Sequence, residues 1–250
     1  MTFKFYSFLI FISVFNCINP SKDLPKESLN LLSFVNPFIG TGGHGHTFPG
    51  ATLPFGMMQL SPDTRLDGWD GCSGYHYSDT YIYGFSHTHL SGTGVSDYGD
   101  ILLMPSNKVI FNNGSDGKEG YKTLFSHENE IAEPGYYKVA LDRINVDAEL
   151  TVSKRSGMHK YQYASPENQF LILDLAHRDQ LLDYKIQKID AYSLSGYRHS
   201  KAWAENQQLF YYIQFSHPIK KISYELSDKA IGKKNYKFGG KYRISLVPRN

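Results

Sequence analysis

The sequence predicts an all-β fold, an antiparallel β-sandwich with few or no long helices. Between residues 144 and 152 apolar residues alternate with polar ones, the period of two by which a strand buries one face of a sheet. Further short segments are rich in β-branched and aromatic residues, and aromatic residues make up 15% of the chain. Many short strands without helical periods between them are typical of a sandwich.

The predicted strands lie in the second half of the chain. Residues 136–141 precede the alternating strand, and Asp142-Arg143 between the two predicts a hairpin. Further strands are predicted at residues 170–173, 209–215, 222–226 and 242–247. Residues 34–100, by contrast, are rich in Gly, His and aromatic residues and lack regular periodicity. We expect loops carried on a scaffold there, and function should be sought in them.

The N-terminus predicts an export signal followed by a tether. Lys4 precedes an apolar run that ends at Phe15 and is too short to cross a membrane. We assign residues 1–17 to a signal peptide, residues 18–33 to a polar linker and residues 34–250 to the folded domain.

Cys17 closes the apolar run where a bacterial lipoprotein carries its lipidated cysteine. The preceding Val14-Phe15-Asn16 departs from the small residues that such processing prefers. The expected location is therefore the periplasm or, with a lipid anchor at Cys17, the outer membrane as a lipoprotein. Without the signal peptide Cys72 is the only cysteine, so no internal disulfide forms.

The charge balance argues against a nucleic-acid partner. Lys and Arg number 26 against 24 Asp and Glu, and no basic run is clustered enough to follow a phosphate backbone. The only predicted contact with a membrane is the anchor at Cys17.

A glycine-rich segment, residues 35–57, contains five glycines between positions 40 and 50. Glycines allow backbone to approach a ligand closely, and His44 and His46 supply hydrogen-bonding groups among them. The segment is not a phosphate loop, because no Gly-Lys-Ser/Thr sequence follows. The alternative is a tight turn in which the histidines cap backbone groups.

A second segment, residues 61–77, contains Trp69 between a glycine and an aspartate. Its polar neighbours favour solvent, and an exposed indole offers a flat apolar face to the C–H side of a sugar ring. Asp70 and Arg65 are candidates to hydrogen-bond the hydroxyls. The alternative is that Trp69 plugs one end of the sandwich. Cys72 has no dedicated base nearby in the sequence, so we expect an inert thiol at the pocket wall.

A third segment, residues 83–100, contains His87 and His89, which point the same way in an extended strand, with Asp97 or Asp100 available to complete a metal site. A Ser86-His87-Asp97 hydrolase can also be written, but no Gly-x-Ser-x-Gly turn accompanies it. Ordinary loop hydrogen bonds are the alternative to both.

Together these segments resemble the N-terminal domain of glycoside hydrolase family 92, the calcium-dependent exo-α-mannosidases. The resemblance runs from Val35 to Pro105 and rests chiefly on residues 36–42 (NPFIGTG), 54–57 (PFGM), 72–79 (CSGYHYSD) and 84–94 (GFSHTHLSGTG). It implies a galactose-mutarotase-like β-sandwich packed on a C-terminal (α/α)6 barrel, with the active site between them.

The resemblance also implies which groups this chain supplies. In the family, Ca²⁺ and both catalytic carboxylates of the inverting reaction come from the barrel, so no catalytic or metal-binding residue is assigned here. The sandwich supplies loops that shape the sugar site. By resemblance, Trp69, Asp70 and Cys72 form the pocket wall, with His46 and His87 behind them. The chain ends at Asn250, where family members continue, and we expect a truncated reading frame or a split gene.

The sequence therefore predicts the carbohydrate-binding N-terminal domain of an α-mannosidase, inactive alone. Its predicted partners are mannose-containing glycans and a separately encoded catalytic barrel. Two alternatives stay open: a stand-alone surface glycan-binding lipoprotein, and a metal-dependent hydrolase that uses His87, His89 and Asp97.

Overall fold

The computed structural model describes residues 30–108, 110–224 and 241–246. The predicted signal peptide, Cys17 and residues 18–29 of the predicted linker lie outside the described residues. From Leu32 onwards the described residues belong to one compact unit. They contain no α-helix, only the 3₁₀ turns η1 (Leu31–Phe34) and η2 (His127–Asn129). No helix in this part of the chain has the length and hydrophobicity to cross a membrane.

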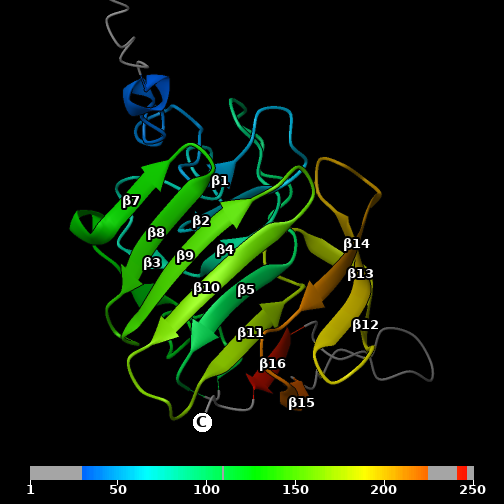
Figure 1. Cartoon of the computed structure of the whole chain (residues 1–250). Coiled ribbons are helices and arrows are strands. Elements are labelled where there is room, and N and C mark those ends of the chain that lie inside the picture. Colours follow the sequence, from blue (N-terminus) through cyan, green and yellow to red (C-terminus); the bar gives the residue numbers. More distant parts are fainter. Residues whose placement is uncertain (1–29, 109, 225–240, 247–250) are drawn as a thin grey trace, which may run out of the picture. The chain divides into compact units, whose positions relative to one another are not determined.

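Three antiparallel sheets form the framework (Figure 1). The largest contains β1 (Ala51–Thr52), β2 (Gln59–Asp63), β4 (Gly84–Ser86), β5 (Leu102–Ser106), β11 (Phe170–Asp174), β16 (Lys241–Leu246) and β15 (Ile219–Tyr224). A second contains β10 (Gly157–Tyr163), β9 (Val146–Val152), β8 (Tyr136–Leu141) and β7 (Glu130–Glu133), and a third contains β12 (Gln180–Lys188), β13 (Ser193–Lys201) and β14 (Gln207–Gln214). β3 (Tyr81–Ile82) pairs with β6 (Thr123–Leu124).

The centre of the largest sheet is buried on both faces, as β5 shows. Leu102 and Met104 enter a core shared with the four-stranded sheet, whereas Leu103, on the opposite face, enters a core shared with the three-stranded sheet. A strand buried on both faces is apolar at successive positions, which explains why β5 does not alternate. The result is a sandwich with a third layer.

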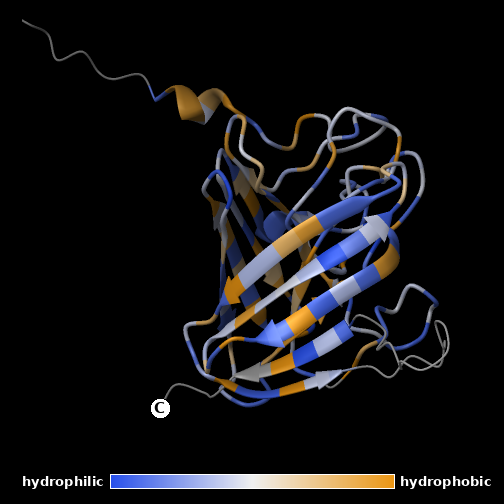
Figure 2. Ribbon diagram, turned by 90° about the vertical axis from the view of Figure 1, so that its right-hand side faces the viewer, coloured by the Kyte–Doolittle hydropathy of each residue, from blue (hydrophilic) through white to orange (hydrophobic). Residues whose placement is uncertain are grey.

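The β8–β9 hairpin shows how the alternating sequence builds one of these layers. Tyr137 pairs with Leu150 and Val139 pairs with Ala148, and all four side chains are buried. Each large apolar side chain buried in this way stabilises the fold by about 1.5–3 kcal/mol. The alternation of hydrophobic and hydrophilic residues is visible along the strands in Figure 2.

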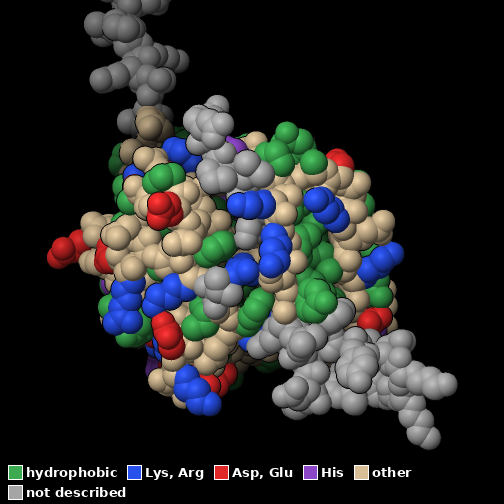
Figure 3. Space-filling model, turned by 90° about the horizontal axis from the view of Figure 1, so that it is seen from below, with side chains coloured by type: hydrophobic (Ala, Val, Ile, Leu, Met, Phe, Trp, Pro, Cys, Tyr) green, Lys and Arg blue, Asp and Glu red, His purple; other side chains and the backbone are tan. Residues whose placement is uncertain are grey.

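The predicted all-β sandwich is confirmed, and so are the strands predicted in the second half of the chain, with bounds shifted by a few residues. Positions 225, 226 and 247 of the predicted strands lie outside the described residues. Residues 34–100 are mostly loops, as expected, but they also contribute β2 and β4 to the largest sheet. Seen from below, basic and acidic side chains are interspersed with apolar ones on the lower face (Figure 3).

Candidate functional site

Three loops that are separate in the sequence meet at one end of the sandwich, in the upper part of Figure 1. They are residues 44–50, residues 65–77 and residues 91–98, and we call them the histidine, tryptophan and glycine loops. The amide of Gly92 donates to the carbonyl of His46 at 2.7 Å. The hydroxyl of Ser73 donates to the carbonyl of Thr47 at 3.0 Å. The fold thus joins segments that the sequence presents separately.

Trp69 lies on the surface of this cluster, and its side chain is 65% exposed. Its ring rests on Gly94 so closely that a Cβ placed there would lie 2.4 Å from the ring carbon Cη2. The ring also meets the imidazole of His46 in a T-shaped contact, with the ring centroids 5.3 Å apart and the planes at 76°. The alternative that Trp69 plugs the sandwich is therefore wrong. The indole is seated on backbone and most of it faces solvent.

Asp70 accepts two histidine contacts beside this ring. His44 Nδ1 lies 2.6 Å and His46 Nε2 lies 3.3 Å from Asp70 Oδ1. The hydrogen bond from His44 is the main cause that lowers the pKa of Asp70. Asp70 therefore stays ionised, and its Oδ2 takes part in neither histidine contact. The sequence indicates His44 as a hydrogen-bonding group beside His46, but it does not assign His44 to the pocket wall.

Cys72 lies beneath the surface instead of facing it. Its side chain is fully buried, and its thiol donates to the carbonyl of Thr93 in the glycine loop. Burial raises the pKa of the thiol, which disfavours the nucleophilic thiolate. Cys72 therefore supports the wall from behind.

Arg65 belongs to the tryptophan loop, but its guanidinium is already engaged. It donates to both carboxylate oxygens of Asp79, from Nη2 at 2.6 Å and from Nε at 3.1 Å. Its aliphatic stem packs against Gly71, where a Cβ would lie 2.5 Å from Arg65 Cδ. Arg65 therefore stabilises the tryptophan loop through its contacts with Asp79 and Gly71.

His87, predicted to lie behind the wall, contacts residues outside the three loops. Its Nδ1 lies 2.7 Å from the carbonyl oxygen of Ile101, and its Nε2 lies 2.9 Å from His159 Nε2 on β10. Desolvation lowers the pKa of His87 to about 4. The ring of His87 therefore contacts β10 and the residue that precedes β5.

The residues of the predicted metal-dependent hydrolase are directed to different partners. His89 Nδ1 contacts the carbonyl oxygen of Gln59 at 2.7 Å. Asp97 Oδ2 accepts from the amide of Ala204 at 2.9 Å, far along the sequence. Ser86 contacts His89 at 3.1 Å, instead of His87, and both side chains are buried. The structure therefore assembles neither the metal site nor the serine triad.

One group in the cluster was not foreseen at all. Arg178, from the segment after β11, donates from Nη2 to the carbonyl of Gly71 at 3.1 Å. These residues are 107 positions apart, and no motif surrounds the arginine. Only the fold brings it beneath the tryptophan loop.

The comparisons with known proteins agree with this architecture. Residues 34–245 match the model of the glycosyl hydrolase family 92 N-terminal domain. The chain belongs to glycosyl hydrolase family 92.

Its relatives are much longer proteins. The family 92 α-mannosidase BT3965 from Bacteroides thetaiotaomicron is 32% identical with a TM-score of 0.78, covering 88% of this chain and 31% of that enzyme. A curated relative from Arthroderma benhamiae, described as an uncharacterized secreted glycosidase, is 31% identical over 142 residues, 54% of this chain and 17% of the relative. The family 92 inverting mannosidase BT2199 from Bacteroides thetaiotaomicron shares the fold, with a TM-score of 0.71 at 22% identity. The match covers 89% of this chain and 30% of that enzyme. This chain spans less than a third of each.

The resemblance assigns the calcium ion to a barrel domain. In the described part of this family 92 chain, no group of three or more His, Cys, Asp or Glu side chains is arranged to hold a metal ion.

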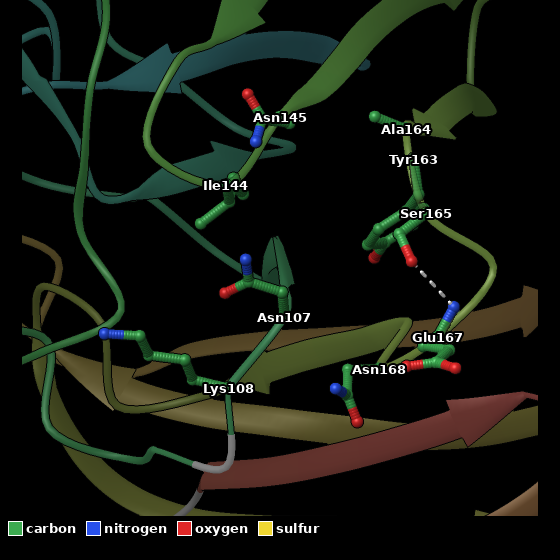
Figure 4. Close-up of a pocket in the computed structure, with 9 residues that line it drawn as sticks. All are labelled: Asn107, Lys108, Ile144, Asn145, Tyr163, Ala164, Ser165, Glu167 and Asn168. Carbon is green, nitrogen blue, oxygen red and sulfur yellow. Dashed lines mark hydrogen bonds between the residues drawn. The ribbon is translucent and has the colours of Figure 1, made fainter.

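A groove of about 310 Å³ (Figure 4) has no residue of the three loops in its lining. It is lined by Asn107, Lys108, Ile144, Asn145, Tyr163, Ala164, Ser165, Glu167 and Asn168. None of the predicted site residues of this family 92 chain lines it. The candidate site is therefore the open surface around Trp69.

Proposed function

We propose that this chain is the carbohydrate-binding N-terminal domain of a family 92 α-mannosidase and that the surface around Trp69 contacts a mannoside. The observation that carries the proposal is the exposed indole held on Gly94, with the Asp70 carboxylate next to it. An apolar ring beside a charged acceptor matches a sugar, which has a C–H face and hydroxyl groups around its edge.

Each group has a defined task in this proposal. The face of Trp69 stacks on the C–H side of the ring. Asp70, held ionised by His44 and His46, accepts hydrogen bonds from hydroxyl groups, and a charge-assisted bond of this kind is stronger than a neutral one. His46 orients both partners, because it contacts the Asp70 carboxylate and the Trp69 ring.

The same surface argues that the chain does not hydrolyse glycosides alone. An inverting glycosidase needs a protonated carboxyl group and a second carboxylate about 6.5–9.5 Å away. Asp70 is a poor proton donor, because its pKa is lowered. In our proposal the acid, the base and the calcium ion belong to a catalytic barrel, encoded separately or in a longer chain, which acts on α-linked mannosides of glycans.

We also propose export, with a lipid anchor at Cys17. Support comes from the charged and apolar N-terminal sequence and from the relative described as a secreted glycosidase. Radiolabelled palmitate incorporated by the full-length chain in a bacterial host, and lost in the Cys17→Ser variant, is the expected result. Equal labelling of both chains would contradict the anchor.

Two measurements on the purified domain test the main proposal. We expect no mannose release from an α-1,2-mannobiose, and release by this chain alone would contradict the assigned division of labour. Calorimetry with the same sugar should show weak binding that the Trp69→Ala variant loses. Binding that survives in Trp69→Ala would refute the site. High affinity without the barrel would favour an independent glycan-binding lipoprotein.

A further inference from the structure

Arg178 connects the tryptophan loop to the glycine loop from beneath. Its Nη2 donates to the carbonyl oxygens of Gly71 and Cys72, at 3.1 and 3.4 Å. The same nitrogen donates to the hydroxyl of Ser96 in the glycine loop. Gly94, on which the Trp69 ring rests, lies in the glycine loop together with Ser96. One guanidinium therefore contacts both the segment that carries the indole and the segment on which the indole rests.

Two glycines make the space that the arginine needs. Gly74 has a φ of +88°, and a Cβ there would lie 2.3 Å from Asp63 Oδ1 and 3.0 Å from Arg178 Nη1. Gly99 has a φ of +75°, and a Cβ there would lie 2.6 Å from Arg178 Cδ. Both positions combine a left-handed backbone with close approach, which only glycine accepts without strain. The loops are thus built around the arginine.

The charge of Arg178 is compensated below the loops. Its side chain is only 1% exposed, and its Nη1 lies 4.0 Å from Asp63 Oδ1. Asp63 also faces His89 and His177, with nitrogen to oxygen distances of 3.3 and 3.4 Å. Burial pushes the pKa of Asp63 upward, but the two histidines outweigh it and lower the pKa. Asp63 therefore stays ionised and balances the guanidinium, whose Nη2 is directed to the loops.

We propose that Arg178 is a positioning residue, which joins the 69–72 turn to the 93–96 segment and so holds the Trp69 indole exposed on Gly94. The effect on mannoside binding rests on the proposed function, whereas the effect on the indole does not. A ligand that finds the ring already ordered avoids the entropy cost of ordering it. Ordering one or two side chains on binding weakens the affinity about three- to tenfold.

The test uses NMR relaxation of the purified domain in wild-type, Arg178→Lys and Ser96→Ala forms. A lysine keeps the charge but lacks the planar fork that reaches two loops. Ser96→Ala removes one contact and leaves no charge unbalanced. Arg243→Lys is the matched control, because Arg243 is also a buried arginine, 8% exposed, but lies on β16 and donates to Ser223.

We expect the amide order parameters of residues 69–72 and 93–96 to fall from about 0.85 to below about 0.6 in Arg178→Lys. A smaller fall is expected in Ser96→Ala and none in Arg243→Lys. Unchanged values in a folded Arg178→Lys would overturn the proposal. If that variant does not fold, unchanged values in Ser96→Ala would overturn it.

Calorimetry then separates this inference from the proposed function. Affinity for α-1,2-mannobiose should fall about three- to tenfold in Arg178→Lys. If the tryptophan loop becomes mobile in Arg178→Lys, the positioning role is supported. If the wild-type chain at the same time binds no mannoside, the sugar site is refuted. Unchanged affinity with a mobile loop would refute the link between positioning and binding.

Discussion

Replacing Asp179 with Asn should change how the stability of this domain depends on pH. Asp179 lies against Asp97 at the base of the glycine loop, and the amide of Tyr98 donates to both carboxyl groups, at 2.9 and 3.0 Å. Burial is the main cause that raises the pKa of Asp179 to about 7, and the hydrogen bond with Asp97 adds to it, whereas the positive charge of Arg198 opposes it.

The magnitude follows from the shift. The pKa rises from 3.8 to about 7, and each pKa unit corresponds to about 1.4 kcal/mol, so the full shift corresponds to about 4 kcal/mol. Because water screens part of this charge, we expect about half, ~2 kcal/mol. Between pH 3.8 and about 7 the folded state holds a proton that the unfolded chain has released. The free energy of unfolding therefore falls as the pH rises through this window.

The assay is urea denaturation of the wild type and of Asp179→Asn at pH 5 and pH 8. About two pKa units of the shift lie between pH 5 and about 7, so the difference in unfolding free energy between the two proteins should change by about 1.3 kcal/mol in favour of the variant on going to pH 8. Asp142→Asn is the control, because Asp142 is exposed in the β8–β9 turn. Parallel pH profiles for the wild type and Asp179→Asn would refute the reasoning.

Three further outcomes are expected. Trp69→Ala should change the unfolding free energy by less than about 0.5 kcal/mol, because the ring is 65% exposed, and a larger loss in thermal unfolding would show that the ring is structural. Cys72 should react slowly with a thiol reagent at pH 8 in the folded domain and rapidly in urea, because burial raises its pKa; fast labelling of the folded protein would place the thiol at the surface. An NMR titration of His87 should give a midpoint near pH 4, since desolvation lowers its pKa to about 4, whereas a midpoint near 6.5 would mean that the ring is hydrated.

Strands were predictable from the sequence where only one face is buried. Residues 146–152 alternate regularly, and β9 has the predicted pattern. β2 escaped notice because Leu60 is followed by the buried polar residues Ser61 and Asp63, which no hydrophobic period reveals. β13 was missed for a similar reason, since its fully buried Arg198 is paired with Asp100. Buried polar partners that are distant in sequence hide strands from pattern reading.

The sequence predicted the part of the candidate site for which the neighbouring residues decide whether a side chain is exposed. Trp69, set among Gly and Asp, was expected at the surface and lies there. The role of Arg178 could not be predicted from the sequence, because its partners are the backbone carbonyls of Gly71 and Cys72, which have no sequence signature. His87 was placed behind the wall by family resemblance, and the structure turns its ring toward His159 on β10.

The most direct test of the central claim is a titration of the ¹⁵N-labelled domain with methyl α-mannoside, followed at the two indole N–H signals. Trp203→Phe identifies the signal of Trp69. We expect a saturable shift of the Trp69 signal with the mannoside and a smaller shift with methyl α-glucoside. A Trp69 signal that does not move at millimolar mannoside, or a shift confined to Trp203, would contradict it.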